Sequence, residues 1–173
     1  MASRETAASL DDVADAVLGA SRALVGIAAR SMPEGDEVTL SQYRALVLLA
    51  SHGPITSGTL AELLDVHPST TTRLVDRLET KGFVERSATD DRREVVVSLA
   101  PKAIALLRDV TRRRRAEIRK ALQHLPDDLS PDQLAAAFRA FAAATGEVPD
   151  DRWSIILNNP TEPVRTSTSR SST

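Results

Sequence analysis

The chain has 173 residues, a length that predicts one domain with short appendages. Lys and Arg number 22 against 24 Asp and Glu, so the formal charge is −2, and apolar residues make up 42%. This balance is typical of a globular protein and argues against a chain that is disordered over its whole length. Cysteine is absent, which excludes disulfides, thiolate zinc sites and cysteine nucleophiles and fits a reducing compartment.

The sequence also argues against a membrane protein. The longest purely apolar run, residues 45–50, is far shorter than the about 20 residues that a membrane helix needs. The N-terminal stretch MASRETAASLDD reaches acidic residues without the apolar core of a secretory signal. We therefore expect a cytoplasmic protein without a membrane partner. Because the chain is not basic overall, any DNA contact has to be local.

Helices dominate the first part of the chain. An amphipathic pattern predicts a helix from Leu10 to Ala28, and Ser9 with Asp12 has the spacing of a helix start. Thr39 and Gln42 form a capping box for a second helix, which stops at His52-Gly53-Pro54. A short helix over 57–65 follows. Pro68 then stands at the N1 position of a fourth helix that ends at Lys81-Gly82.

The pattern next changes to that of two strands. Residues 83–86 and 94–99 predict a β-hairpin around the polar turn 87–93. Two short helices joined by a tight turn and followed by a hairpin form a winged helix-turn-helix. The predicted fold is therefore mainly α with a small β-hairpin wing.

Two helices are predicted after the wing. One runs from Pro101 to about Leu125, and the other starts at the capping box Ser130-Pro131-Asp132-Gln133. We expect the last helix to bury one face, made of Leu134, Ala137, Phe138, Phe141 and Ala142. The Ser- and Thr-rich residues 161–173 predict a mobile tail.

The fourth helix combines an apolar face with a polar one. A helical wheel places Thr71, Leu74, Val75 and Leu78 on the anchoring side. Short hydroxyl side chains and arginine on the other side suit a DNA major groove. The candidate DNA-binding residues on that side and its flanks are Ser69, Thr70, Thr72, Arg73 and Arg77. A merely solvated polar face would show the same pattern, so the helix alone leaves both interpretations open.

The hairpin tip adds a second set of candidate DNA contacts. Arg92 and Arg93 are placed where a guanidinium can enter a narrow minor groove. Asp91 is close enough in sequence to hold Arg93 by a salt bridge. Hairpin tips are also charged simply because they are exposed, but the wing and the helix together favour DNA binding.

The stretch from Leu40 to Leu99 resembles the multiple-antibiotic-resistance regulator (MarR) family. The matching pieces are GPIT at 53–56, LAELLDV at 60–66, PSTTTRLVDRLETKGFVER at 68–86, and DRR at 91–93 followed by VVVSL. This resemblance implies a homodimer on a pseudo-palindromic site in double-stranded DNA. It also implies a repressor that a small aromatic or anionic effector releases. His67 and Thr71 depart from the family pattern, which usually has a small capping residue and Val at these positions.

With this resemblance, we divide the chain into four parts. Residues 1–36 form an N-terminal dimerisation helix and linker, and residues 37–99 form the winged helix-turn-helix DNA-binding lobe. Residues 100–146 form the C-terminal dimerisation helices, and residues 147–173 form a tail.

Residues 112–115 are four consecutive arginines. The rotation of about 100° per residue places Arg114 and Arg115 near the apolar stripe of their helix. In one interpretation they snorkel, or pair with acidic residues of a partner helix. In the other they are a ligand-binding site for an anionic effector.

No pattern points to catalysis, a metal or a cofactor. His52, His67 and His124 lie in different predicted elements, and no phosphate loop, nucleophile elbow or HExxH motif occurs. We therefore expect no enzyme. Two functions remain: a ligand-responsive DNA-binding repressor, and a winged-helix protein-interaction module that does not bind DNA.

Overall fold

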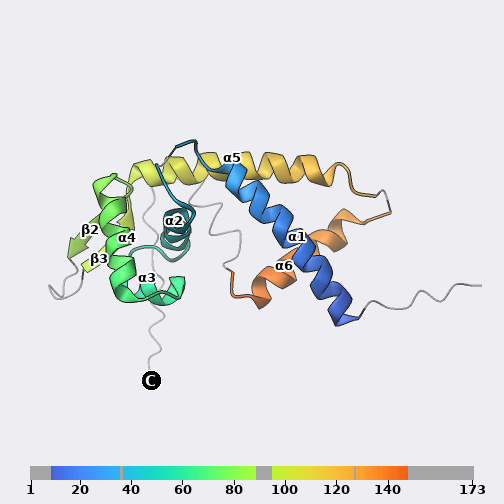
Figure 1. Cartoon of the computed structure of the whole chain (residues 1–173), viewed down its shortest axis with the longest axis horizontal. Coiled ribbons are helices and arrows are strands. Elements are labelled where there is room, and N and C mark those ends of the chain that lie inside the picture. Colours follow the sequence, from blue (N-terminus) through green and yellow to red (C-terminus); the bar gives the residue numbers. More distant parts are fainter. Residues whose placement is uncertain (1–8, 36, 89–94, 127, 148–173) are drawn as a thin grey trace, which may run out of the picture.

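The computed structural model describes residues 9–35, 37–88, 95–126 and 128–147. This part of the chain contains helices and a small antiparallel sheet, which confirms the predicted fold class (Figure 1). In chain order the elements are α1 (Leu10–Ser31), α2 (Leu40–His52), β1 (Ile55–Thr56), α3 (Ser57–Leu64), α4 (Pro68–Thr80), β2 (Val84–Ala88), β3 (Val95–Leu99), α5 (Pro101–Leu122) and α6 (Pro131–Ala144).

Local hydrogen bonds fix where the first two helices begin. Ser9 Oγ accepts from the Asp12 N–H at 3.1 Å, and the Asp12 carboxylate accepts from the Ser9 N–H at 2.9 Å. Thr39 and Gln42 make the same reciprocal pair at the start of α2. The helix start predicted at Ser9 and the capping box predicted at Thr39 are confirmed, and each pair satisfies N–H groups that a helix start leaves unpaired. At the start of α6 only half of the predicted capping box forms among the described residues, because the Gln133 N–H donates to Ser130 Oγ at 3.5 Å without a return bond from the Ser130 N–H.

Three strands pair in one small antiparallel sheet. Its strand order is β1-β3-β2, with Ile55 opposite Val97 and Val84 opposite Leu99. The hairpin of β2 and β3 was predicted, with strand ends shifted by one or two residues, whereas β1 was not. The hairpin tip lies outside the described residues, and with it the candidates Asp91, Arg92 and Arg93.

The hydrophobic core lies within the lobe. Helix α2 runs through its centre, and the N-terminal half of α5 packs against it through Ala103, Leu107 and Val110, which are fully buried. Other fully buried core side chains are Leu46, Leu60, Val75, Leu78, Phe83 and Val97. This packing holds α4 and the wing on one rigid body.

Helices α1 and α6 and the far half of α5 extend away from the lobe (Figure 1). The prediction that α6 buries a face is wrong for the single chain, since none of its residues is buried and the side chains of Phe138 and Phe141 are each 50% exposed. No element among the described residues buries that face. Helix α5 ends at Leu122 rather than near Leu125, and the predicted mobile tail at 161–173 lies outside the described residues.

No described helix combines the length and the hydropathy that a bilayer crossing requires.

Candidate nucleic-acid interface

A tight turn sets the direction of α4. Asp65 ends α3 in the left-handed region with a φ of 53°, a conformation that Asp tolerates better than most residues. The Val66 N–H then donates to the Ala61 carbonyl at 3.1 Å, which closes the end of α3. Because of this turn, α4 begins only a few residues after α3 ends.

The predicted anchoring face of α4 is confirmed. Thr71, Val75 and Leu78 are fully buried, and Leu74 is half-buried against the core. The Thr71 hydroxyl is buried with no hydrogen-bond partner in the described part of the chain. These contacts fix the rotation of α4 about its own axis, so its opposite face is held toward solvent.

His67 caps α4 in place of the small residue usual in the resemblance. Its Nδ1 accepts from the Ser69 backbone N–H at 3.3 Å and from the Ser69 hydroxyl at 2.9 Å. Pro68 occupies the first helical position, as predicted. The imidazole therefore satisfies a free N–H of the helix start and at the same time orients the Ser69 side chain.

The structure brings the five helical candidates together on one exposed surface. Ser69, Thr70, Thr72, Arg73 and Arg77 are all exposed. Among the described residues, no carboxylate is paired with Arg73 or Arg77. The Ser69 and Thr72 hydroxyls donate within the helix start, to His67 Nδ1 and to the Pro68 carbonyl at 3.0 Å. This surface, which we call the polar face of α4, thus presents hydroxyl oxygens and two available guanidinium groups.

A residue that sequence reasoning missed lies beside the polar face. Arg86 of β2 contacts two carboxylates of α4: its Nη1 lies 2.5 Å from Glu79 Oε2, and its Nη2 lies 2.6 Å from Asp76 Oδ1. The sequence separations of seven and ten residues between a helix and a strand match no local pairing pattern. The pair depends on how β2 returns along α4.

A second cluster of charged residues lies where the start of α5, the end of α4 and the segment before α2 meet. Lys102 at the start of α5 lies 2.9 Å from the Glu37 carboxylate, and its Nζ stands 4.4 Å from the centre of the Phe83 ring. The Lys81 ammonium donates to the Glu37 carbonyl at 2.7 Å. These contacts join the link between α1 and α2 to the end of α4.

The four arginines of α5 have different surroundings. Arg112 and Arg113 both pair with Asp109 of the same helix, the latter at 2.5 Å. Arg114 is half-buried, its guanidinium lies 5.7 Å from the centre of the Tyr43 ring, and its Nε has no hydrogen-bond partner in the described part of the chain. Arg115 is exposed. The structure therefore separates the two ligand-site candidates, because only Arg114 turns toward the core.

The environment of Tyr43 reflects this contact. Burial raises the pKa of the Tyr43 hydroxyl above its ordinary value, while the charge of Arg114 and hydrogen bonding with Thr111 act in the opposite direction. A buried phenol beside a half-buried cation defines an aromatic, positively charged corner between α2 and α5.

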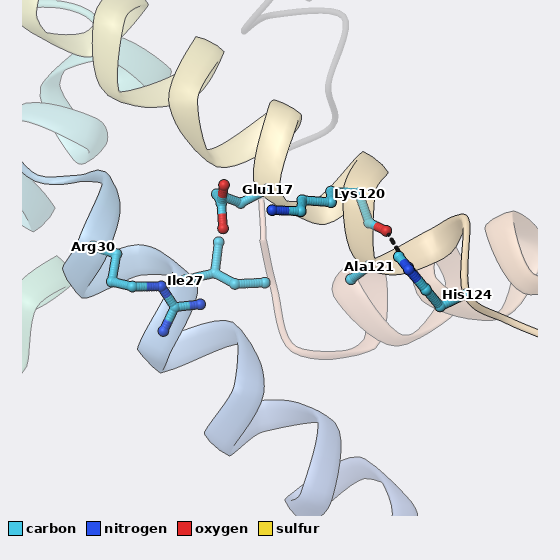
Figure 2. A pocket seen from close by; sticks show the side chains of 6 residues that line it. All are labelled: Ile27, Arg30, Glu117, Lys120, Ala121 and His124. Carbon is cyan, nitrogen blue, oxygen red and sulfur yellow. Dashed lines mark hydrogen bonds between the residues drawn. The ribbon is translucent and has the colours of Figure 1, made fainter.

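A separate pocket of about 260 Å³ opens between α1 and α5, lined by Ile27, Arg30, Glu117, Lys120, Ala121 and His124 (Figure 2). Within it, the His124 Nδ1–H donates to the Lys120 carbonyl at 2.9 Å. Neither Arg114 nor Arg115 lines this pocket. Nowhere among the described residues do three potential metal ligands cluster.

The lobe and its polar face define a winged helix-turn-helix protein, and comparison with known proteins gives its family. Residues 38–95 match the sequence model of the MarR family. The multiple antibiotic resistance protein MarR of Salmonella typhimurium is 31% identical over 100 residues, which span 57% of this chain and 67% of that protein. The chain belongs to the MarR family of helix-turn-helix transcriptional regulators, a family of regulators and not of enzymes.

Two further likenesses agree with this assignment. The uncharacterized helix-turn-helix regulator YfiV of Bacillus subtilis is 33% identical over 107 residues, and the match spans 61% of this chain but only 64% of YfiV. The crystal structure of RV1404 from Mycobacterium tuberculosis has a TM-score of 0.74 and 38% identity, and the match covers 83% of this chain and 99% of that one.

Proposed function

We propose that this chain represses transcription as a homodimer that binds a pseudo-palindromic operator in double-stranded DNA and is released by a small effector. The observation that carries this proposal is the polar face of α4, held outward by a buried opposite face. Ser69, Thr70, Thr72, Arg73 and Arg77 enter the major groove in this account. Asp91, Arg92 and Arg93 act at the wing tip, where arginine reaches the minor groove.

Two similar proteins support the repressor and DNA parts of the proposal. MdtR of Bacillus subtilis, which is named a transcriptional repressor, is 29% identical over 127 residues, or 80% of its length. FabT of Streptococcus pneumoniae shares the fold, with a TM-score of 0.61 at 17% identity, and was crystallised in complex with DNA.

Exposed apolar side chains on the long helices support the homodimer. Monomeric proteins rarely leave large apolar patches uncovered. The exposed large apolar side chains on α1 and α6 are Leu10, Val13, Leu18, Leu24, Val25, Phe138 and Phe141. Pairing two chains through these helices would also set two copies of α4 side by side for the two half-sites of an operator.

The surroundings of Arg114 support the release by an effector. The half-buried guanidinium of Arg114 is suited to a carboxylate, and the Tyr43 ring beside it is suited to an aromatic ring. Arg115, although exposed, remains a candidate to attract the anion. BpsR of Bordetella bronchiseptica is a fold neighbour at 19% identity and a TM-score of 0.56, and 6-hydroxynicotinic acid regulates its DNA binding.

Alanine variants test the effector site. With 6-hydroxynicotinic acid as the probe, Arg114→Ala should abolish probe-induced release from DNA and leave the affinity without probe nearly unchanged. Arg115→Ala should show a weaker form of the same effect. Collapse of the dimer in these variants would instead show that the arginines pair across the interface.

A salt titration distinguishes the proposed function from a winged-helix protein-interaction module. Fluorescence anisotropy would measure the affinity of the wild type for a duplex that covers the DNA upstream of its own gene. The logarithm of the binding constant should fall linearly with that of the salt concentration, with a slope of about −0.9 per phosphate contacted. Absence of binding at low salt would leave the interaction module as the function.

A further inference from the structure

The helix proposed to enter DNA carries two negative charges. Asp76 shares the polar face with Arg73, which lies three residues earlier, and Glu79 follows three residues after Asp76. The side chains of Asp76 and Glu79 are 53% and 40% exposed. Carboxylates at such positions repel DNA phosphates, and Asp76 is at a helical spacing that lets it pair with Arg73. Without a compensating positive charge, the two carboxylates would therefore weaken DNA binding in two ways, by repelling phosphates and by pairing with Arg73.

Arg86 compensates both charges from outside the helix. Its two terminal nitrogens contact different carboxylates, at 2.5 Å to Glu79 and 2.6 Å to Asp76. A planar guanidinium can hold two carboxylates in this way, which the single ammonium group of lysine cannot do with the same geometry. The Arg86 side chain is 27% exposed, the least of the three, so it lies between β2 and α4 rather than out in solvent.

We propose that Arg86 is a positioning residue for DNA binding. By holding Asp76 and Glu79 against β2, it neutralises the acidic side of α4 and leaves the Arg73 guanidinium available for DNA. This inference rests on the proposed DNA-binding function and assigns to it a residue outside the polar face.

Two simpler roles for Arg86 lead to different expectations. In a direct contact with a phosphate, the guanidinium would use N–H groups that the two carboxylates leave unoccupied. A purely stabilising role is small, because exposed ion pairs contribute little to folding. In both of these accounts Arg86→Ala would cost the same affinity in the protein with neutralised carboxylates as in the wild type. In the proposed account Arg86→Ala costs little affinity once the carboxylates are neutral.

The experiment compares four proteins by fluorescence anisotropy on the duplex upstream of the gene. They are the wild type, Arg86→Ala, the double variant Asp76→Asn with Glu79→Gln, and the triple variant that combines all three changes. Arg86→Ala should bind roughly tenfold more weakly or worse, because two uncompensated charges then face the phosphates. The triple variant should bind within about threefold of the double variant, because Arg86 then has no charge left to compensate. Raising the salt concentration should shrink the Arg86→Ala defect through screening.

The controls separate this inference from the proposed function. Arg119→Ala removes one exposed arginine at the far end of α5 and should leave the affinity unchanged. Thermal unfolding of each variant checks that the fold is intact. If Arg86→Ala weakens binding in the double variant as much as it does in the wild type, while the wild type binds, the positioning role alone is overturned. A wild type that does not bind would overturn both proposals.

Discussion

Thr71 places a polar hydroxyl group in an apolar part of the core. Its hydroxyl is fully buried in the lobe, and no described group accepts or donates a hydrogen bond to it. Replacing it with Val keeps the shape and removes the unpaired polar group. We expect Thr71→Val to raise the free energy of unfolding by about 1 kcal/mol.

Urea denaturation measures this change, and Thr71→Ser is the matched control. Serine keeps the hydroxyl and loses a methyl group from the core, so it should lower stability. A Thr71→Val protein that unfolds at the same or a lower urea concentration than the wild type would show that the hydroxyl has a partner in solution.

His67 is expected to contribute through its cap. Removing the imidazole leaves the Ser69 N–H at the start of α4 without its acceptor. His67→Ala should therefore lower the free energy of unfolding by about 1 kcal/mol, whereas His67→Asn, a good capping residue, should lose little. Equal urea midpoints for His67→Ala and the wild type would contradict the capping role.

Tyr43 gives a pH-dependent prediction. Its pKa is raised above the ordinary value of 10.0, chiefly by burial, so the folded protein favours the neutral phenol. The unfolded chain loses the proton first as the pH rises. The contribution of Tyr43 to stability is thus complete below pH 10 and is lost as the pH passes through the folded pKa.

Absorbance of the phenolate tests this directly, because the chain has a single tyrosine. The midpoint in the folded protein should lie above 10, and Arg114→Ala should raise it further by removing a nearby positive charge. A midpoint at or below the ordinary value would show that the ring is not buried.

A residue's role could be predicted from the sequence when its partner lies only a few residues away along the chain. The caps at Ser9 and Thr39 depend on groups three residues apart, so the chain itself displays them. The contacts of Arg86 depend on how β2 lies along α4. No spacing within either element shows that arrangement.

The same distinction holds for whole elements. The helices of the lobe were predicted because their apolar residues repeat with the helical period and their ends carry strong signals. Strand β1, at Ile55–Thr56, is too short to show a period and exists through its pairing with β3. The apolar residues of α6 repeat with the helical period, and this pattern predicts a buried face. The pattern does not show whether the same chain or another molecule buries that face, so the prediction is wrong for the single chain.

Helix α6 carries the prediction for oligomerisation. Phe138 and Phe141 lie on the same side of the helix and are half exposed in the single chain. If they pack against a second copy, Phe138→Glu with Phe141→Glu should convert the dimer to a monomer, because two charges would be buried at the interface.

Sedimentation velocity at micromolar concentration measures this conversion. The control, Arg139→Glu, changes a charge on the same helix without removing an apolar side chain. A wild type that is already monomeric, or a double variant that stays dimeric, would contradict the proposed role of α6.

At the scale of the whole molecule, α5 spans two regions of the described chain. Its first half packs into the lobe, and its second half extends with α1 and α6 away from it (Figure 1). In the proposed homodimer, a change in how the long helices of the two chains pair would therefore move the lobe. The half-buried Arg114 lies on this helix near Tyr43 of the lobe core, so an effector bound there would act on the connection between the two regions.

The proposed function requires the polar face of α4 to read DNA sequence, and two arginine variants on two duplexes measure whether it does. Anisotropy at fixed salt would measure the affinity of the wild type, Arg73→Ala and Arg93→Ala for the upstream duplex and for a scrambled duplex of the same composition. Arg73→Ala should lose about 1–3 kcal/mol on the upstream duplex and little on the scrambled one. Arg93→Ala should weaken both duplexes more evenly. Equal affinity of all three proteins for both duplexes would contradict the account and favour an interaction module.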